Sequence, residues 1–241
     1  MKMSIGDKIK AAQEESRRFD NVKLGIGVPH NFHSVPMAFF DSFITMETPP
    51  FVYIRSSAGQ IEDMRNGLVR EALAAGCTHL IMMDTDQVYH PRTIRKLLSH
   101  KLPIVGCLVY RRYPPFDPLM FKGTQSKYLN INTWREGELV KVDATGTGCL
   151  LFDMKVFKIL PEPWFKHILP GDGIEEEGED FYFCRNAREA GLEIYVDTSI
   201  PCGHLSQMIV NEGTYKLYSR MKEAELKAMH KVEHGAVVAV E

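Results

Sequence analysis

The chain has 241 residues, enough for one large α/β domain, and 44% of them are hydrophobic, as is usual for a folded core. Its 29 basic and 31 acidic residues are well mixed and leave a formal net charge of -2, which argues against a surface for nucleic acid. The five cysteines form no CxxC pair, and no stretch approaches the ~20 apolar residues that a membrane span needs. We therefore expect a cytoplasmic protein with reduced thiols and no membrane span.

Strand and helix patterns alternate along the first half of the chain. Apolar runs predict strands at residues 22–28, 51–54, 79–83 and 104–110. Apolar residues at helical spacing predict helices at residues 32–46, at residues 61–75 before Gly76, and from Pro91 onward. Strands that alternate with helices predict a mostly parallel sheet.

The second half of the chain has a different texture. Prolines and polar residues follow Arg111, and short strands are predicted at residues 140–143, 150–152 and 194–196. A last helix is expected over residues 212–230. We interpret residues 1–241 as a single domain with two halves (22–112 and 113–210), followed by a C-terminal helix and tail (211–241).

Asp84-Thr85-Asp86 closes the apolar run at residues 79–83. Acidic residues at the carboxyl end of a buried strand lie over the ligand crevice of an open α/β sheet. Along an extended chain, Asp84 and Asp86 point the same way, and hard oxygen ligands on one side suit Mg²⁺ or Mn²⁺ carrying a diphosphate. The alternative is that the motif only caps the helix that begins near Pro91.

Four segments appear in a familiar order: residues 61–66 (IEDMRN), 83–86 (MDTD), 142–151 (VDATGTGCLL), and 178–181 (GEDF) with 202–204 (CGH). Together they resemble the family 2-like glycosyltransferases of the GT-A fold. The resemblance implies an α/β chain with a single GT-A-like (Rossmann-like) domain, in which helices flank a mostly parallel central sheet. It also implies that residues 22–112 form a nucleotide-binding half and residues 113–210 an acceptor and catalytic half. It also implies transfer of a sugar from a nucleotide-diphosphate sugar, UDP- or GDP-linked, to an unidentified acceptor hydroxyl, with inversion.

The resemblance implies metal ligands at Asp86, Asp84 and His204, with Asp86 ranked above Asp84. Imidazole suits Mn²⁺ better than Mg²⁺, so Mn²⁺ is the preferred divalent cofactor. A histidine satisfied within a loop is the alternative for His204. The HxxH pair of His30 and His33 is interpreted as structural.

The resemblance places the general base of an inverting enzyme at Asp180, with Glu179 in support. Carboxylates at this position also fit a simple helix cap. Donor contacts are predicted for residues of the first half of the chain. They are Pro29, Asp63, Arg65, Asn66, Asp84 and Asp86.

Three other functions remain open. A sugar-phosphate nucleotidyltransferase normally has a Gly-rich, basic loop after its first strand, and no Arg or Lys cluster follows Gly25 and Gly27 here. A non-catalytic nucleotide-sugar-binding protein of the same fold would keep the motifs without turnover. Paired carboxylates also occur in glycoside hydrolases, which work without a cation. The sequence does not reveal the oligomeric state.

Overall fold

The computed structural model describes residues 19–124, 127–171, 176–207, 212–213, 215–217 and 219–221. Contacts divide the chain into two compact units, residues 1–205 and 206–241. The described residues between 212 and 221 are helical, and the rest of the helix predicted at 212–230 lies outside the described residues. The single-domain organisation stays a prediction, and every predicted site residue belongs to the first unit.

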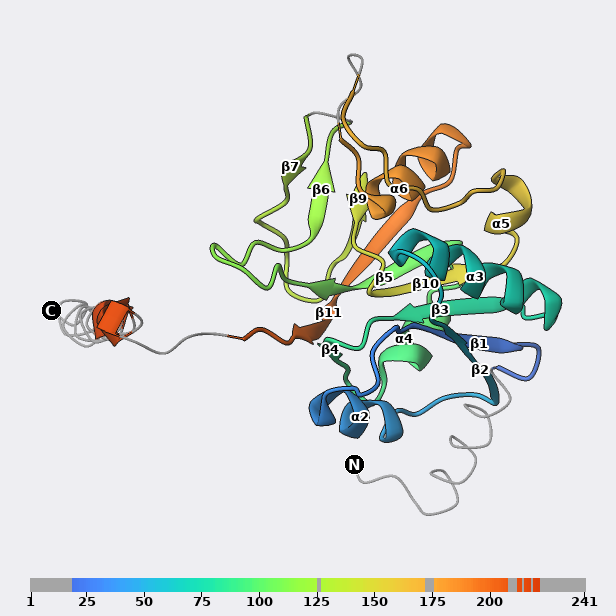
Figure 1. The fold of residues 1–241 in the computed structure, drawn as a ribbon, viewed down its shortest axis with the longest axis horizontal. Helices are drawn as coiled ribbons and strands as arrows, with labels where there is room; N and C mark the ends of the chain where they lie inside the picture. Colours follow the sequence, from blue (N-terminus) through green and yellow to red (C-terminus); the bar gives the residue numbers. More distant parts are fainter. Residues whose placement is uncertain are drawn as a thin grey trace, which may run out of the picture. The chain divides into compact units, whose positions relative to one another are not determined.

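An eight-stranded sheet forms the centre of the first unit (Figure 1). Its order is β2-β1-β3-β10-β5-β11-β4, and β8 pairs with β11. The strands are β1 (Leu24–Pro29), β2 (Phe51–Ser56), β3 (His79–Met83), β4 (Gln87–Val88), β5 (Ile104–Val109), β8 (Leu139–Val142), β10 (Cys149–Asp153) and β11 (Ile194–His204). A smaller three-stranded sheet contains β6 (Met120–Lys122), β7 (Leu129–Asn130) and β9 (Ala144–Thr145).

Five strands of the central sheet run in one direction. β1 pairs in parallel with β2 and β3, and β5 pairs in parallel with β11. β10 lies antiparallel to both β3 and β5, so these two neighbours point the same way. β4 and β8 run antiparallel to β11. The mostly parallel sheet predicted from the sequence is therefore confirmed.

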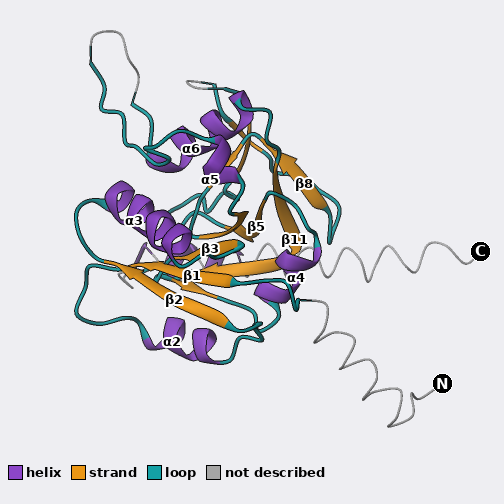
Figure 2. Ribbon diagram, turned by 90° about the vertical axis from the view of Figure 1, so that its right-hand side faces the viewer, coloured by secondary structure: helices purple, strands orange, loops and turns teal. Residues whose placement is uncertain are grey.

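Side chains that alternate along the strands enter two separate hydrophobic cores. In β3, Leu80 and Met82 pack on the side of α3, α5 and α6, whereas Ile81 and Met83 pack on the side of α2 and α4. Figure 2 shows the sheet between these two layers of helices. The helices are α2 (Met37–Ile44), α3 (Ile61–Ala74), α4 (Thr93–Ser99), α5 (Val156–Ile159) and α6 (Glu179–Glu189).

The observed elements differ from the predicted ones mainly at their ends. The helix predicted at residues 32–46 begins only after Pro36, because proline fits just before a first turn and interrupts a helix elsewhere. Gly76 follows the end of α3 with a φ of 67°, a left-handed conformation that favours glycine and agrees with its predicted role as a stop. Strands of two or three residues, such as β4 and β9, carry no periodic signal and were not predicted.

All five cysteines are buried and free, as expected for reduced thiols. Within the described ranges, no helix combines the length and the apolar character required to cross a bilayer. The cytoplasmic location stays a prediction.

β10, which runs antiparallel to β3, and the last part of β11 bring distant segments of the chain to the carboxyl end of β3. β10 starts there, because Cys149 pairs with Met83, and it carries the preceding Gly146 to Gly148 beside the acidic motif. β11 continues past its bulge to pair with β4, where His204 lies opposite Gln87. The sheet topology therefore places residues from three parts of the sequence at one edge.

Candidate active site

The strand before the acidic motif ends at Met83, and residues 84–86 form a turn. The backbone N–H of Gln87 points to the backbone carbonyl oxygen of Asp84, with the nitrogen 3.4 Å from the oxygen. The prediction that Asp84 and Asp86 extend the strand and point the same way is therefore wrong. Each carboxylate binds a different arginine, Asp84 to Arg65 and Asp86 to Arg112.

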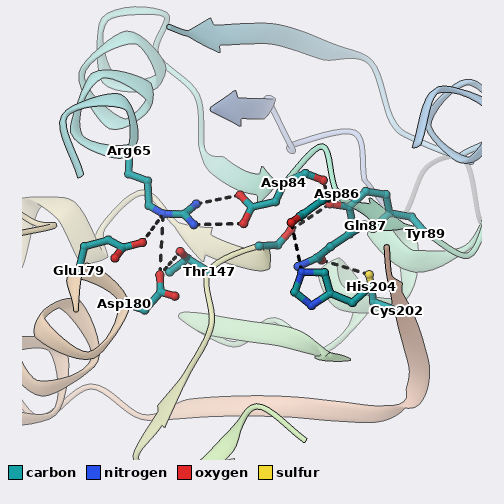
Figure 3. A network of polar contacts seen from close by, with 11 residues as sticks. Arg65, Asp84, Asp86, Gln87, Tyr89, Thr147, Glu179, Asp180, Cys202 and His204 are labelled. Atoms are coloured by element: carbon teal, nitrogen blue, oxygen red, sulfur yellow. Dashed lines mark hydrogen bonds and ion pairs between the residues drawn. The ribbon is translucent and has the colours of Figure 1, made fainter. Parts of the chain in front are cut away.

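Arg65 lies between the acidic turn and the start of α6 (Figure 3). Its guanidinium donates to both carboxylate oxygens of Asp84, at 3.1 and 3.2 Å, and its Nε lies 3.4 Å from Glu179 and 3.8 Å from Asp180. Only 3% of the Arg65 side chain is exposed. Burial alone would lower the pKa of Arg65, but Asp84, Asp180 and Glu179 together raise it, so the cation is kept. The predicted contact of Arg65 with a donor is not supported by these contacts, because three carboxylates surround the group.

Asp180 stands at the first turn of α6 with one oxygen already bound. Thr147 donates its hydroxyl hydrogen bond to Oδ1, the same oxygen that faces Arg65. Burial raises the pKa of Asp180 to about 7, and the neighbouring charge of Glu179 adds to the shift. A carboxylate with a pKa near neutrality is suited to accept a proton in catalysis.

Asp86 forms a second and more open cluster. Its Oδ2 lies 2.5 Å from Nη1 of Arg112 and 3.3 Å from Nε2 of His204. Burial alone would raise the pKa of Asp86, but the hydrogen bond from His204 and the charges of His204 and Arg112 lower it below its usual value. The Asp86 carboxylate is therefore ionised at neutral pH.

The orientation of His204 is set by a backbone carbonyl. Nδ1 of His204 lies 2.8 Å from the Tyr110 carbonyl oxygen, which only accepts, so Nδ1 must carry a hydrogen. In a neutral ring Nε2 then presents a lone pair to the Asp86 carboxylate, which is repulsive unless a proton or a metal cation lies between them. The hydrogen bond with Asp86 raises the pKa of His204 accordingly.

A cavity of about 710 Å³ opens beside the acidic turn. Asp84, Thr85, Asp86 and Arg112 line one part of it, and the loop after β1 and the start of α3 line the rest. The lining of that second part includes Pro29, Phe32, Val35, Gln60, Ile61 and Met64. A separate cavity of about 400 Å³ beside α4 is lined by His90, Arg92, Arg95 and Lys96 and contains none of the predicted site residues.

Tyr89 and Gly148 hold the acidic turn in place, and neither was predicted as a site residue. The Asp84 amide donates to the Gly148 carbonyl oxygen at 2.9 Å. The Tyr89 hydroxyl lies 2.7 Å from the Asp84 carbonyl oxygen and 3.0 Å from that of Gly148, and it is buried enough to hold its pKa well above 10. The sequence signal for this contact is the pair of glycines on either side of Thr147, which lets the backbone pass close to a neighbour.

Two predicted donor-binding residues make structural contacts. Both ends of the Asn66 amide bind the backbone of residues 164 and 165, with Nδ2 donating at 2.7 Å and Oδ1 accepting at 3.0 and 3.1 Å. The Asp63 carboxylate accepts a hydrogen bond from the backbone N–H of Gln60 in the capping box of α3. Donor contacts by Asn66 and Asp63 remain predictions that these bonds do not support.

No protein-family model matches the sequence, and no curated protein does. Among solved structures, A197 from STIV is 15% identical, with a TM-score of 0.53 over 79% of this chain and 87% of that chain. TarS 1–349 of S. aureus in complex with UDP-GlcNAc is 13% identical, with a TM-score of 0.46 over 78% of this chain. The match spans 60% of the TarS chain.

Proposed function

We propose that this chain, whose fold is the GT-A-like fold of glycosyltransferases, transfers a sugar from a nucleotide-diphosphate donor, UDP- or GDP-linked, to an acceptor hydroxyl with inversion. One observation carries the proposal. At the end of β3, Asp86 lines a cavity of about 710 Å³ and contacts His204, and Asp180 lies on the other side of the Arg65 and Asp84 pair. A divalent cation held by Asp86 and His204, and a proton accepted by Asp180, would together serve such a transfer.

The residues at the cavity fit a divalent cation. His204 is oriented through Nδ1 by a backbone carbonyl, as metal-binding histidines commonly are, and its Nε2 converges with Asp86. Among the described residues no group of three or more His, Cys, Asp or Glu side chains could enclose a metal. Magnesium and similar cations are commonly bound by one or two carboxylates while substrate phosphates and water complete the shell, so two protein ligands suffice.

A bound divalent cation, Mn²⁺ preferred over Mg²⁺, would act as a Lewis acid that stabilises the charge developing on the diphosphate. Asp86 and His204 are the proposed ligands. Both oxygens of Asp84 already accept hydrogen bonds from Arg65, which ranks it below Asp86 as a ligand.

Asp180 is the proposed general base, and Glu179 supports it through Arg65. Thr147 and Arg65 both approach Oδ1, so Oδ2 is the oxygen that receives the proton of the acceptor hydroxyl. As that proton leaves, the acceptor oxygen forms a bond to the anomeric carbon. The bond from that carbon to the phosphate oxygen breaks, and its electron pair stays on the nucleoside diphosphate. Attack opposite to the leaving group inverts the anomeric centre.

Donor turnover tests the proposal directly. The purified chain is incubated with UDP- and GDP-sugars and Mn²⁺, and release of the nucleoside diphosphate is measured for the native chain, Asp86→Ala and Asp180→Asn. We expect release by the native chain and a loss of at least about 100-fold in each variant. Arg92→Gln, in the separate cavity beside α4, serves as a control that keeps the native rate.

Three results would contradict the proposal and identify its rivals. Pyrophosphate released from a nucleoside triphosphate would indicate a nucleotidyltransferase. Nucleotide-sugar binding without turnover of any donor would indicate a binding protein. Glycoside hydrolysis that persists in EDTA would indicate a hydrolase.

A further inference from the structure

Arg112 occupies the corner where the proposed metal ligands converge. Oδ2 of Asp86 accepts a hydrogen bond from Nη1 of Arg112 at 2.5 Å, and the same oxygen lies 3.3 Å from Nε2 of His204. A small divalent cation must approach a carboxylate oxygen to about 2.1 Å. A guanidinium and a divalent cation carry charges of the same sign, so they compete for Oδ2.

The surroundings of Arg112 allow it to leave Asp86 without leaving the cavity. Its side chain is 44% exposed, compared with 3% for Arg65. It follows the end of β5 at Val109, its guanidinium stands 5.5 Å from the ring centre of Tyr113, and it lines the cavity together with Asp84 and Asp86. An exposed ion pair of this kind stabilises a protein only weakly, by about 0 to 1 kcal/mol, and is readily exchanged.

We propose that Arg112 is an exchangeable cation, which neutralises Asp86 in the empty site and moves to the donor diphosphate when a divalent metal takes its place. This inference rests on the proposed function, because it requires a diphosphate and a metal at this cavity. The exchange keeps every charge paired: the metal takes over Asp86, and the planar guanidinium, which matches phosphate oxygens with two parallel hydrogen bonds, takes over the phosphates. Arg112 is then a donor-binding residue that also weakens metal binding before the donor arrives.

Mn²⁺ binding measured by electron paramagnetic resonance tests the exchange without any turnover. The variants are Arg112→Gln, Arg112→Lys and Asp86→Asn, and Arg135→Gln removes one exposed positive charge elsewhere as a matched control. Without nucleotide, we expect Arg112→Gln to bind Mn²⁺ about fivefold more tightly than the native chain, since the competing ion pair is gone. Arg112→Lys and Arg135→Gln keep the native affinity, and Asp86→Asn loses binding.

UDP binding in the presence of Mn²⁺ supplies the second half of the test. We expect Arg112→Gln to weaken UDP binding by about tenfold, because the charge-assisted bonds to phosphate are lost, while the control leaves it unchanged. The same variant therefore has opposite effects on the metal and on the nucleotide.

The two failures are distinguishable. If the native chain binds Mn²⁺ through Asp86 and Arg112→Gln changes neither affinity, the exchange is overturned and the proposed function stands. If neither the native chain nor Arg112→Gln binds Mn²⁺, the exchange and the proposed metal site are both overturned.

Discussion

The two carboxylates of one short motif lie in contrasting surroundings. Asp84 is held through both oxygens by Arg65, which is 3% exposed and also faces Glu179 and Asp180. Asp86 is approached by Arg112, which is 44% exposed, and by His204. Both carboxylates line the same cavity, but Asp84 is paired with a buried arginine and Asp86 with an exposed one.

The contrast separates a fixed part of the site from an exchangeable part. Breaking a buried charge cluster leaves uncompensated charges in a poorly solvated place, so such a cluster keeps its geometry. An exposed pair is weakened by water and salt and can change partners. We infer that Arg65 positions Asp84 and Asp180, whereas Asp86 and Arg112 are the groups that respond to ligand.

The strongest test of this contrast compares the two arginines by stability. Arg65→Leu leaves Asp84, Glu179 and Asp180 without their shared cation, and we expect it to lower the free energy of unfolding by about 3 to 5 kcal/mol. Arg112→Gln removes an exposed pair, and we expect a loss below about 1 kcal/mol. Urea denaturation of both variants measures the difference.

Arg65→Lys refines that comparison. It keeps the charge but loses the planar fork that binds both oxygens of Asp84, so its stability should fall between those of the native chain and Arg65→Leu. Equal losses for Arg65→Leu and Arg112→Gln would remove the distinction between a fixed and an exchangeable half.

A smaller effect is expected at Gly148, which packs directly against the acidic turn. A Cβ atom built there would lie 2.1 Å from Nε2 of Gln87 and 2.8 Å from Oδ2 of Asp84. Because Gln87 is itself buried, Gly148→Ala must displace the turn, and we expect it to destabilise the chain by about 1 to 3 kcal/mol. Thermal unfolding measures the loss, and Gly171→Ala, whose Cβ would meet nothing within 4 Å, is the matched control. A stable Gly148→Ala would show that the turn is not held from this side.

The smallest effect concerns pH. Burial, with the neighbouring Glu179, raises the pKa of Asp180 from its usual 3.8 to about 7, so the folded chain holds a proton that the unfolded chain releases between these values. The stability contributed by protonated Asp180 is therefore present at pH 4 and lost as the pH rises through 7. Relative to the native chain, Asp180→Asn should therefore be more stable at pH 8 than it is at pH 5. Because 26% of the side chain is open to solvent, we expect only about 1 kcal/mol, or about 2 to 4 °C in Tm.

The rate of sugar transfer by the native chain should change with pH in the opposite direction to its stability. A general base must be ionised, so the rate should rise with pH and level off above about 7, while Asp180→Asn stays inactive throughout. A native rate that is flat between pH 5 and 8, or an active Asp180→Asn, would remove Asp180 from the role of base.

The sequence predicted the elements that carry a strong period. The apolar run before Asp84 and the three- and four-residue spacing in α3 were sufficient for the strands and helices of the first half, because burial of one face imposes that spacing. The proximity of Asp86 and His204 followed from the family resemblance alone. Spacing could not supply it, since their contact depends on the end of β11 pairing with the two-residue strand β4.

The details that decide chemistry were beyond the sequence. Whether Arg65 binds phosphate or carboxylates depends on how α3 and α6 meet at the sheet edge, and a helical pattern does not encode that distance. Tyr89 is a similar case. The sequence indicates only an ordinary apolar position, whereas the structure places the Tyr89 hydroxyl beside the carbonyl oxygens of Asp84 and Gly148.

A crystal structure with Mn²⁺ and UDP tests the account most directly. We predict Mn²⁺ between Asp86 and His204, UDP in the cavity lined by Pro29, the Arg112 guanidinium on the diphosphate, and Arg65 still paired with Asp84. UDP bound elsewhere, or Mn²⁺ held by Asp84 with Arg65 displaced and Arg112 still on Asp86, would contradict it.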